Sequence, residues 1–183
     1  MSIFLVLDIL LILLILLFAP IGFWRGPVKE LFVTLGVLFG VILADYWARP
    51  WGSDLTDFTS LEQDAGTFVM AMIFLIFATF VVGYGIGATL APSEMLPETR
   101  ALGALIAALN GILLLSFSLQ YVRLFLLSDS NEESLEDSFV ARFLLDDIGW
   151  VLMAAAVIAV PIILYLLLSG RRAYEPEEAY PFG

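Results

Sequence analysis

Residues 3–30 read IFLVLDILLILLILLFAPIGFWRGPVKE, a long apolar run that is closed by two cations and one anion. A helix that crosses the hydrocarbon layer of a bilayer needs about 20 mostly apolar residues, and the stretch 3–24 has that length. A cleavable signal peptide would carry its cations before the apolar run, whereas Arg25 and Lys29 follow it here. We therefore expect a retained membrane helix that has positive charge at its far end.

The composition of the whole chain indicates the same class of protein. Hydrophobic residues make up 61% of the 183 residues, charged residues make up 15%, and the mean hydropathy is +0.99. These values lie outside the range of soluble domains. The polar stretches between the apolar runs are too short for a second folded unit. We predict one helical domain over residues 1–170, followed by an acidic tail over 171–183.

The apolar runs predict an all-α fold, a polytopic transmembrane bundle of about five helices. The expected spans cover residues 3–24, 30–47, 67–90, 101–124 and 148–169. A β-barrel would alternate apolar and polar residues in segments of about ten, and these unbroken runs of Leu, Ile and Phe do not alternate. Acidic loops, SDLTDFTSLEQD at 53–64 and SDSNEESLED at 128–137, are expected between the spans.

The distribution of Lys and Arg predicts the orientation of the chain. With five alternating spans, one side of the membrane receives Arg25, Lys29, Arg100, Arg171 and Arg172. The other side receives Arg49, Arg123 and Arg142. Because loops that stay in the cytoplasm carry the excess of Lys and Arg, we expect the N-terminus outside and the C-terminal tail in the cytoplasm.

A short amphipathic segment precedes the last expected span. Residues 138–150 read SFVARFLLDDIGW. At helical spacing, Phe139, Val140, Phe143 and Leu144 share one side, and Arg142 and Asp146 share another. This pattern is typical of an interfacial helix that lies on the membrane. The alternative is that the segment forms the first turn of the last span.

Several classes of function are excluded by residues that are missing or scarce. The chain has no Cys and no His, so the usual ligands of zinc, copper, iron–sulfur clusters and most haems are absent. We expect no cofactor and no metal site. A net charge of −11 argues against binding to nucleic acid, because a phosphate backbone needs a basic surface.

Small residues recur at four-residue spacing in three of the expected spans. They are Gly36, Gly40 and Ala44, then Gly83 and Gly87, then Gly103, Ala107 and Gly111. In a bilayer such stripes allow helix backbones to approach closely. They would hold the bundle of one chain together, and the alternative is a face between copies in a homo-oligomer.

Ionisable and polar residues at membrane depth are candidates for a functional role. Asp8, Asp45 and Arg123 all fall near the outer ends of their spans, which motivates the hypothesis of an Asp–Arg pair there. Asn110 and Gln120 lie deeper in the fourth expected span and are interpreted as hydrogen-bonding groups between helices.

No set of residues in the sequence predicts catalysis. Ser116 and Ser118 have no base near them in the sequence, and an intramembrane aspartyl dyad would need two carboxylates close together at depth. The spans offer Asp8 and Asp45, both near the edge of the membrane. We therefore predict that the protein is not an enzyme.

Several short motifs resemble the colicin V production protein family, the CvpA-like membrane proteins. An early Asp is followed by GFWRGPVKE, by LGVLFGVILA and later by RALGALIAALNG. The matching positions are Asp8, Gly22, Arg25, Gly26, Glu30, Gly36, Gly40, Arg100, Gly103 and Gly111. Departures are Thr99 in place of a frequent acidic residue, Ala107 in place of a glycine, Asn110 in place of an arginine, and the additional fifth span with its tail.

The resemblance implies a protein of the bacterial plasma (inner) membrane that is linked to colicin V export or production and to envelope homeostasis. It would act by helix packing and by contacts with the lipid bilayer, with other membrane proteins or with copies of itself. One alternative is an accessory subunit of a large respiratory or photosynthetic membrane complex. Another is a small channel or transporter, which would need a polar lining beyond Thr79, Asn110 and Gln120.

Overall fold

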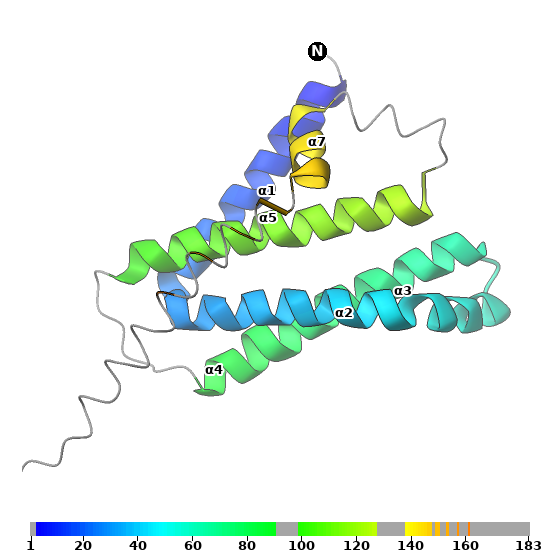
Figure 1. Cartoon of the computed structure of the whole chain (residues 1–183), viewed down its shortest axis with the longest axis horizontal. Helices are drawn as coiled ribbons and strands as arrows, with labels where there is room; N and C mark the ends of the chain where they lie inside the picture. The colour runs from blue at the N-terminus through cyan, green and yellow to red at the C-terminus, as the bar shows by residue number, and fades with distance from the viewer. Residues whose placement is uncertain are drawn as a thin grey trace, which may run out of the picture.

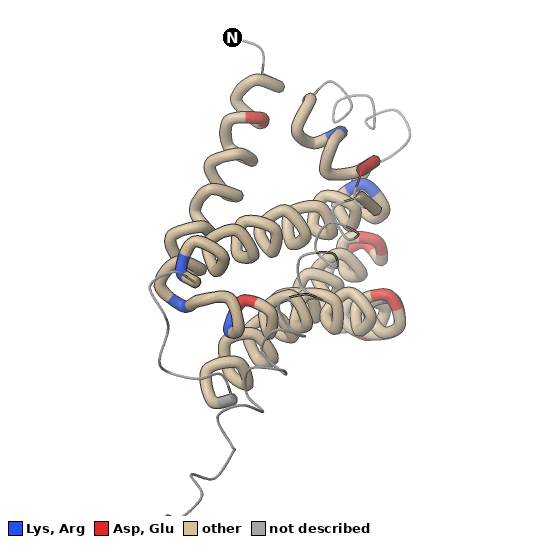
Figure 2. Tube along the Cα trace, turned by 60° about the vertical axis from the view of Figure 1, so that its left-hand side comes forward, with Lys and Arg blue, Asp and Glu red and all other residues tan. Residues whose placement is uncertain are grey.

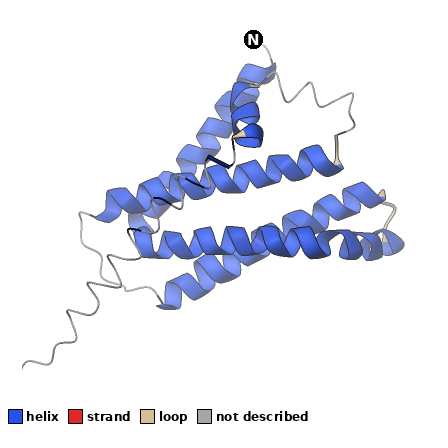
Figure 3. Ribbon diagram, viewed as in Figure 1, coloured by secondary structure: helices blue, strands red, loops and turns tan. Residues whose placement is uncertain are grey.

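The computed structural model describes residues 3–90, 99–127 and 138–147, together with Gly149, Trp150, Met153, Val157 and Pro161. In this part of the chain every regular element is a helix (Figure 3). Four helical stretches are long and apolar enough to cross a membrane. The predicted all-α membrane bundle is therefore confirmed. Apart from those five single residues, the expected span 148–169 and the tail 171–183 lie outside the described residues.

The membrane-length helices follow the expected spans, with different boundaries. The first is α1 (Ile3–Arg25) and the second is α2 (Pro27–Phe58). The third stretch consists of α3 (Gln63–Ala78), a π-helical segment η1 (Thr79–Ile86) and α4 (Gly87–Leu90). The fourth is α5 (Arg100–Phe125), and α7 (Phe139–Asp146) is a short helix after it.

The bundle is built from two antiparallel pairs of helices that α2 and α5 join. α2 packs along α3 and η1, and α1 packs along α5. Gly22 of α1 lies against Gly103 of α5, and Phe18 lies against Gly111, so these two helices run in opposite directions. Although α1 and α2 are consecutive, α1 rises away from α2 beyond their connection (Figure 1).

The seam between α2 and α3 is lined by small residues. They recur every four residues as Gly36, Gly40, Ala44, Ala48 and Gly52, and all are buried. A Cβ atom added to Gly40 would lie 2.9 Å from the Leu75 backbone, and one added to Gly52 would lie 2.6 Å from the Thr67 backbone. Such close approach increases dispersion contacts, which drive helix association in lipid.

The second helix is longer than the sequence predicts, and this corrects the expected loop at 53–64. α2 continues through Pro50 and ends at Phe58, so the first half of that acidic stretch is helical. The extension is held by packing, because Ala48 and Gly52 are buried and Leu55 contacts the hydrophobic core. A helix of this length extends about 48 Å, which exceeds the hydrocarbon layer of a bilayer.

The amphipathic segment forms a separate helix, α7, which ends at Asp146. Asp147 leaves the helical conformation, so α7 is not the first turn of the span expected from residue 148. Its buried residues are Ala141 and Leu144, which pack on α1 and α5, whereas Phe139 stays exposed. The expected apolar side is thus shifted by part of a turn, and its place on the membrane surface stays a prediction.

Charged residues gather near the ends of the long helices (Figure 2). Uncharged stretches cover 9–24 in α1, 31–44 in α2, 65–90 from α3 to α4, and 101–122 in α5. This arrangement leaves the middle of every long helix compatible with the hydrocarbon layer. The charged and polar groups near these boundaries are therefore the places to look for a functional site.

Candidate functional site: a buried polar cluster where four helices meet

The connection between α1 and α2 is a single residue, Gly26, with a φ of 82°. At this φ a side chain would be strained, so glycine is required for the reversal. Pro27 then begins α2, where its fixed φ is suitable and its missing N–H costs nothing. The tight connection brings the last residue of α1, Arg25, next to the first turn of α2, which contains Glu30.

Arg25 is folded back into the bundle by three kinds of contact. Its Nη1 donates to Glu30 Oε1 at 2.9 Å, and its Nη2 donates to the main-chain carbonyl of Gly83 at 3.1 Å. The guanidinium also lies over the ring of Tyr84, 3.9 Å from the ring centroid. A cation this close to an aromatic face is attracted by the ring quadrupole. Arg25 therefore ties α1 to α2 and to η1.

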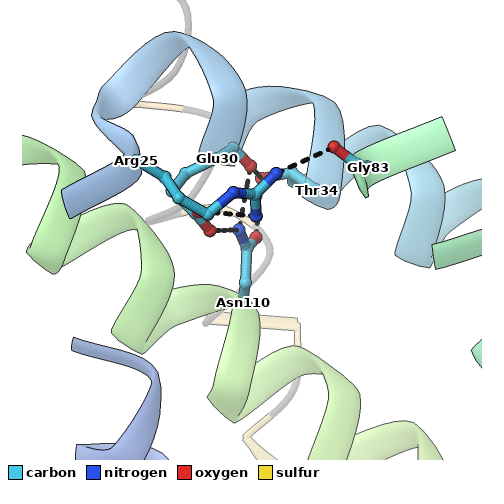
Figure 4. Close-up of polar contacts among 5 residues, drawn as sticks. All are labelled: Arg25, Glu30, Thr34, Gly83 and Asn110. Carbon is cyan, nitrogen blue, oxygen red and sulfur yellow. Dashed lines mark hydrogen bonds and ion pairs between the residues drawn. The ribbon is translucent and has the colours of Figure 1, made fainter. Parts of the chain in front are cut away.

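Asn110 of α5 completes the cluster from the opposite side (Figure 4). Its Nδ2 donates to the main-chain carbonyl of Glu30 at 2.9 Å, and it approaches Glu30 Oε2 at 3.4 Å. Its Oδ1 accepts from the hydroxyl of Thr34 at 2.6 Å. The amide thus uses both its oxygen and its nitrogen, as a buried amide must.

The cluster is buried within the bundle. Glu30 is 2% exposed, Asn110 is fully buried, and the Arg25 side chain is 18% exposed. Asn110 lies ten residues into α5, about 15 Å along the helix axis from Arg100. At such depth unsatisfied polar groups are costly, and the ion pair and hydrogen bonds among these residues offset that cost.

Close helix contacts on both sides hold the cluster in place. Gly103 of α5 lies against Gly22 and against the Gly26 backbone, where an added Cβ would come within 2.8 Å of the Gly26 Cα atom. On the other side, a Cβ at Gly83 would lie 2.7 Å from the Cα atom of Val33. The glycines allow α1, α5, α2 and η1 to approach closely enough for these side chains to reach one another.

All residues predicted for helix packing lie at contacts between helices of this chain. They are Gly36, Gly40, Ala44, Gly83, Gly87, Gly103, Ala107 and Gly111. A face between copies of the chain stays a prediction. Of the predicted charged and polar residues, the cluster unites Arg25, Glu30 and Asn110. It does not include Lys29, which is half-buried nearby, or Arg100, which is exposed at the start of α5.

The residues predicted at the outer ends lie in two separate places. The Asp8 carboxylate accepts from the Ser138 hydroxyl at 2.5 Å and from the Val140 amide at 2.9 Å, which places it at the N-terminus of α7. The Asp45 carboxylate accepts from the hydroxyl of Tyr121 at 3.4 Å. For Asp8 the structure gives partners other than an arginine, and a pair between Arg123 and an aspartate stays a prediction.

Thr34 and Tyr84 were not singled out from the sequence, and Gly83 was predicted for helix packing alone, not as a polar partner. Thr34 lies four residues after Glu30 on the same helix face, which is a signal that helical spacing could have provided. Tyr84 and the carbonyl of Gly83 belong to η1, and a π-helical turn is a frequent sign of a functional position. The sequence GYGIG gives no rule that predicts such a turn.

The contacts of the cluster join helices of the same chain to one another. Each polar group of the cluster contacts another group of the same chain. In the described part of the chain, no group of three Asp or Glu side chains could hold a metal ion. Among the described buried side-chain atoms, the hydroxyl of Ser116 alone has no hydrogen-bond partner.

Four membrane-length helices with an internal polar cluster define an integral membrane protein of the helical-bundle class. The sequence model of the family described as "Colicin V production protein" matches residues 7–149. The chain belongs to this family, and the resemblance inferred from its motifs is confirmed. No curated protein and no solved structure matches the chain significantly.

Proposed function

We propose that this protein is a non-enzymatic scaffold of the bacterial inner membrane, which contributes to colicin V production or export and to envelope homeostasis by contacting partner membrane proteins. Its membership of the colicin V production family supports the proposal, since this is not a known enzyme family. The N-terminus would face away from the cytoplasm and the Arg25 end of the bundle would face it, in keeping with the positive-inside rule.

The observation that carries the proposal is the internal use of the polar cluster. An ion pair and an amide at membrane depth would be candidates for transport or catalysis if they lined an open path. Here Glu30 and Asn110 are bonded to each other, and to Arg25 and Thr34. A site with these contacts fixes the relative positions of α1, α2, η1 and α5, which is what a scaffold requires.

The outward face of α1 is the proposed surface for partners. In the most apolar 18-residue stretch of α1, only 6% of the residues are buried, against 33–44% in the corresponding stretches of the other three long helices. Leu13 and Leu17 are more than half exposed on this face. In the described part of the chain α1 packs on α5 by one face only, and its other face can pack against a helix of another membrane protein.

The first test is purification of the tagged protein from its native membrane in a mild detergent, followed by mass spectrometry of every chain that migrates with it. Recovery of envelope or export proteins with the chain supports the proposal. Fixed partners from a respiratory or photosynthetic complex would instead make it an accessory subunit. Recovery of the chain alone, without any partner after cross-linking in the cell, would contradict it.

A photo-crosslinking amino acid locates the surface. Leu17 on α1 is 61% exposed, and Phe77 on α3 is 62% exposed, so the two positions are matched in access. We expect protein adducts from position 17 and mainly lipid adducts from position 77. Equal yields of protein adducts from both positions would contradict the assignment of the surface to α1, but not the partner-dependent function.

A further inference from the structure

A second polar site lies at the other end of the bundle, far from the Arg25 cluster. A cavity of about 290 Å³ opens between α2 and α5. Asp45 and Arg49 of α2 stand on one side of it, and Gln120 and Tyr121 of α5 stand on the other. The volume lies near the lower limit of ligand pockets, so the cavity suits a small polar group.

The mouth of this cavity carries one negative and one positive side chain, Asp45 and Arg49. Asp45 and Arg49 are one helical turn apart on α2, and both are exposed. In the described part of the chain, Asp45 and Arg49 do not form an ion pair with each other. The Asp45 carboxylate accepts a hydrogen bond from the Tyr121 hydroxyl, and the Arg49 guanidinium lies 5.9 Å from the ring centroid of Phe125. A carboxylate and a guanidinium held side by side match a ligand that carries an ammonium and an anion.

The inner part of the cavity is apolar. It is lined by Val41 and Phe117, which lie about one turn deeper in α2 and α5 than Asp45 and Tyr121. The charged mouth coincides with the level where the uncharged stretches 31–44 and 101–122 end. This is the depth of lipid headgroups in a bilayer that these helices span. The cavity is therefore amphipathic in the same sense as a phospholipid.

We propose that this cavity binds the headgroup of a phospholipid that carries a primary ammonium, such as phosphatidylethanolamine. Asp45 accepts hydrogen bonds from the ammonium, and Arg49 donates to the phosphate. Gln120 supplies a further hydrogen-bonding group. The first part of an acyl chain lies against Val41 and Phe117.

The pattern of charges separates this lipid from others. An anionic lipid such as phosphatidylglycerol would satisfy Arg49, but it would bring no cation to Asp45. Phosphatidylcholine has a quaternary ammonium, which cannot donate a hydrogen bond to a carboxylate. Of these three headgroups, ethanolamine alone offers each of the two side chains a hydrogen bond to a group of opposite charge.

Native mass spectrometry of the detergent-purified full chain tests the site, with phosphatidylethanolamine, phosphatidylglycerol and phosphatidylcholine of matched acyl chains. We expect the wild type to prefer phosphatidylethanolamine. Asp45→Asn should abolish this preference, and Arg49→Gln should lower the affinity for phosphatidylethanolamine about tenfold, the usual effect of losing a charge-assisted hydrogen bond. Arg49→Lys, which keeps the charge, should recover part of the binding.

Matched controls remove a charge of the same sign elsewhere. The control variants are Asp54→Asn, further along α2, and Arg142→Gln, on α7. Both residues are exposed, and neither of them lines the cavity. Both controls should keep the preference of the wild type. Equal binding of the three lipids by the wild type, or an unchanged preference in Asp45→Asn, would overturn the proposal. Displacement of the lipid by equimolar soluble phosphoethanolamine would also overturn it, and would assign the site to a free zwitterion.

Discussion

The side-chain amide of Asn110 on α5 is bonded to the main-chain carbonyl of Glu30 on α2 at 2.9 Å, across 80 residues of sequence. The same amide accepts from Thr34, one turn further along α2. Because α2 and α5 run parallel here, these two bonds set the register between the helices. A shift of either helix by one turn would break both bonds and leave the Asn110 amide without these partners inside the bundle.

Replacing Asn110 by Leu is expected to destabilise the bundle. The substitution removes the bonds from Asn110 to Glu30 and Thr34 inside the bundle, for which the cost is about 1–3 kcal/mol. Unfolding in mixed micelles with increasing SDS measures the effect. Ser118→Ala is the control on the same helix, because that hydroxyl donates to the Leu114 carbonyl within α5. A variant at position 110 that is no less stable than the control would refute the structural role of the amide.

Arg25 and Glu30 are expected to be coupled. Each single replacement by Leu leaves an uncompensated charge in the cluster, which costs about 3–5 kcal/mol when a buried pair is broken. The double variant removes both charges and should be less destabilised than the sum of the singles. A double-mutant cycle measured by SDS unfolding gives this coupling.

The control for this cycle uses Lys29, the neighbouring cation outside the cluster. Lys29→Leu combined with Glu30→Leu should give a coupling near zero, because Lys29 is not the partner of the Glu30 carboxylate. Strict additivity of the Arg25 and Glu30 replacements would show that the ion pair contributes nothing to the bundle.

Gly103 is expected to tolerate no side chain. A Cβ atom there would overlap the carbonyl of Gly22 and lie 2.8 Å from the Gly26 Cα atom, and backbone cannot move aside as a side chain can. Gly103→Ala should cost about 1–3 kcal/mol, the range for overpacked sites. Gly85→Ala is the matched control, since a Cβ there meets only Phe80 O at 3.8 Å. Equal stability of the two variants would contradict the close contact of α1 with α5.

The four described spans could be predicted because lipid imposes a simple rule of length and polarity. That rule places residues 3–24 and 101–124 almost at the observed ends of α1 and α5. It misplaces the end of α2, since the helix beyond the membrane-length run is held by Ala48, Gly52 and Leu55 against its neighbours. Helix ends that depend on tertiary packing leave little trace in local composition.

Individual residues of the candidate site could be predicted from the sequence, but their contacts with one another could not. Arg25 attracts attention as a cation at the end of the first span, Glu30 as a position of the family resemblance, and Asn110 as a polar group within an apolar helix. Their pairing depends on how α5 lies along α2, and no local pattern gives that arrangement. The π-helical segment that presents the Gly83 carbonyl to Arg25 lies close against Val33, and no pattern in its own sequence predicts it.

Asp8 is expected to hold α7 on the bundle. Its carboxylate accepts from the Ser138 hydroxyl and from the Val140 amide, and the Ser138 oxygen in turn accepts from the Ala141 amide at 3.1 Å. An acceptor at a helix N-terminus satisfies amides that have no partner within the helix, and the negative charge is favoured by the helix dipole.

Asp8→Ala should therefore increase hydrogen exchange at the amides of Val140 and Ala141 by about fivefold, the effect of a typical lost cap. Hydrogen–deuterium exchange with mass spectrometry on the purified protein measures this, and Asp146→Asn at the other end of α7 is the control. Unchanged protection in Asp8→Ala would mean that the buried Ala141 and Leu144 alone hold this helix in place.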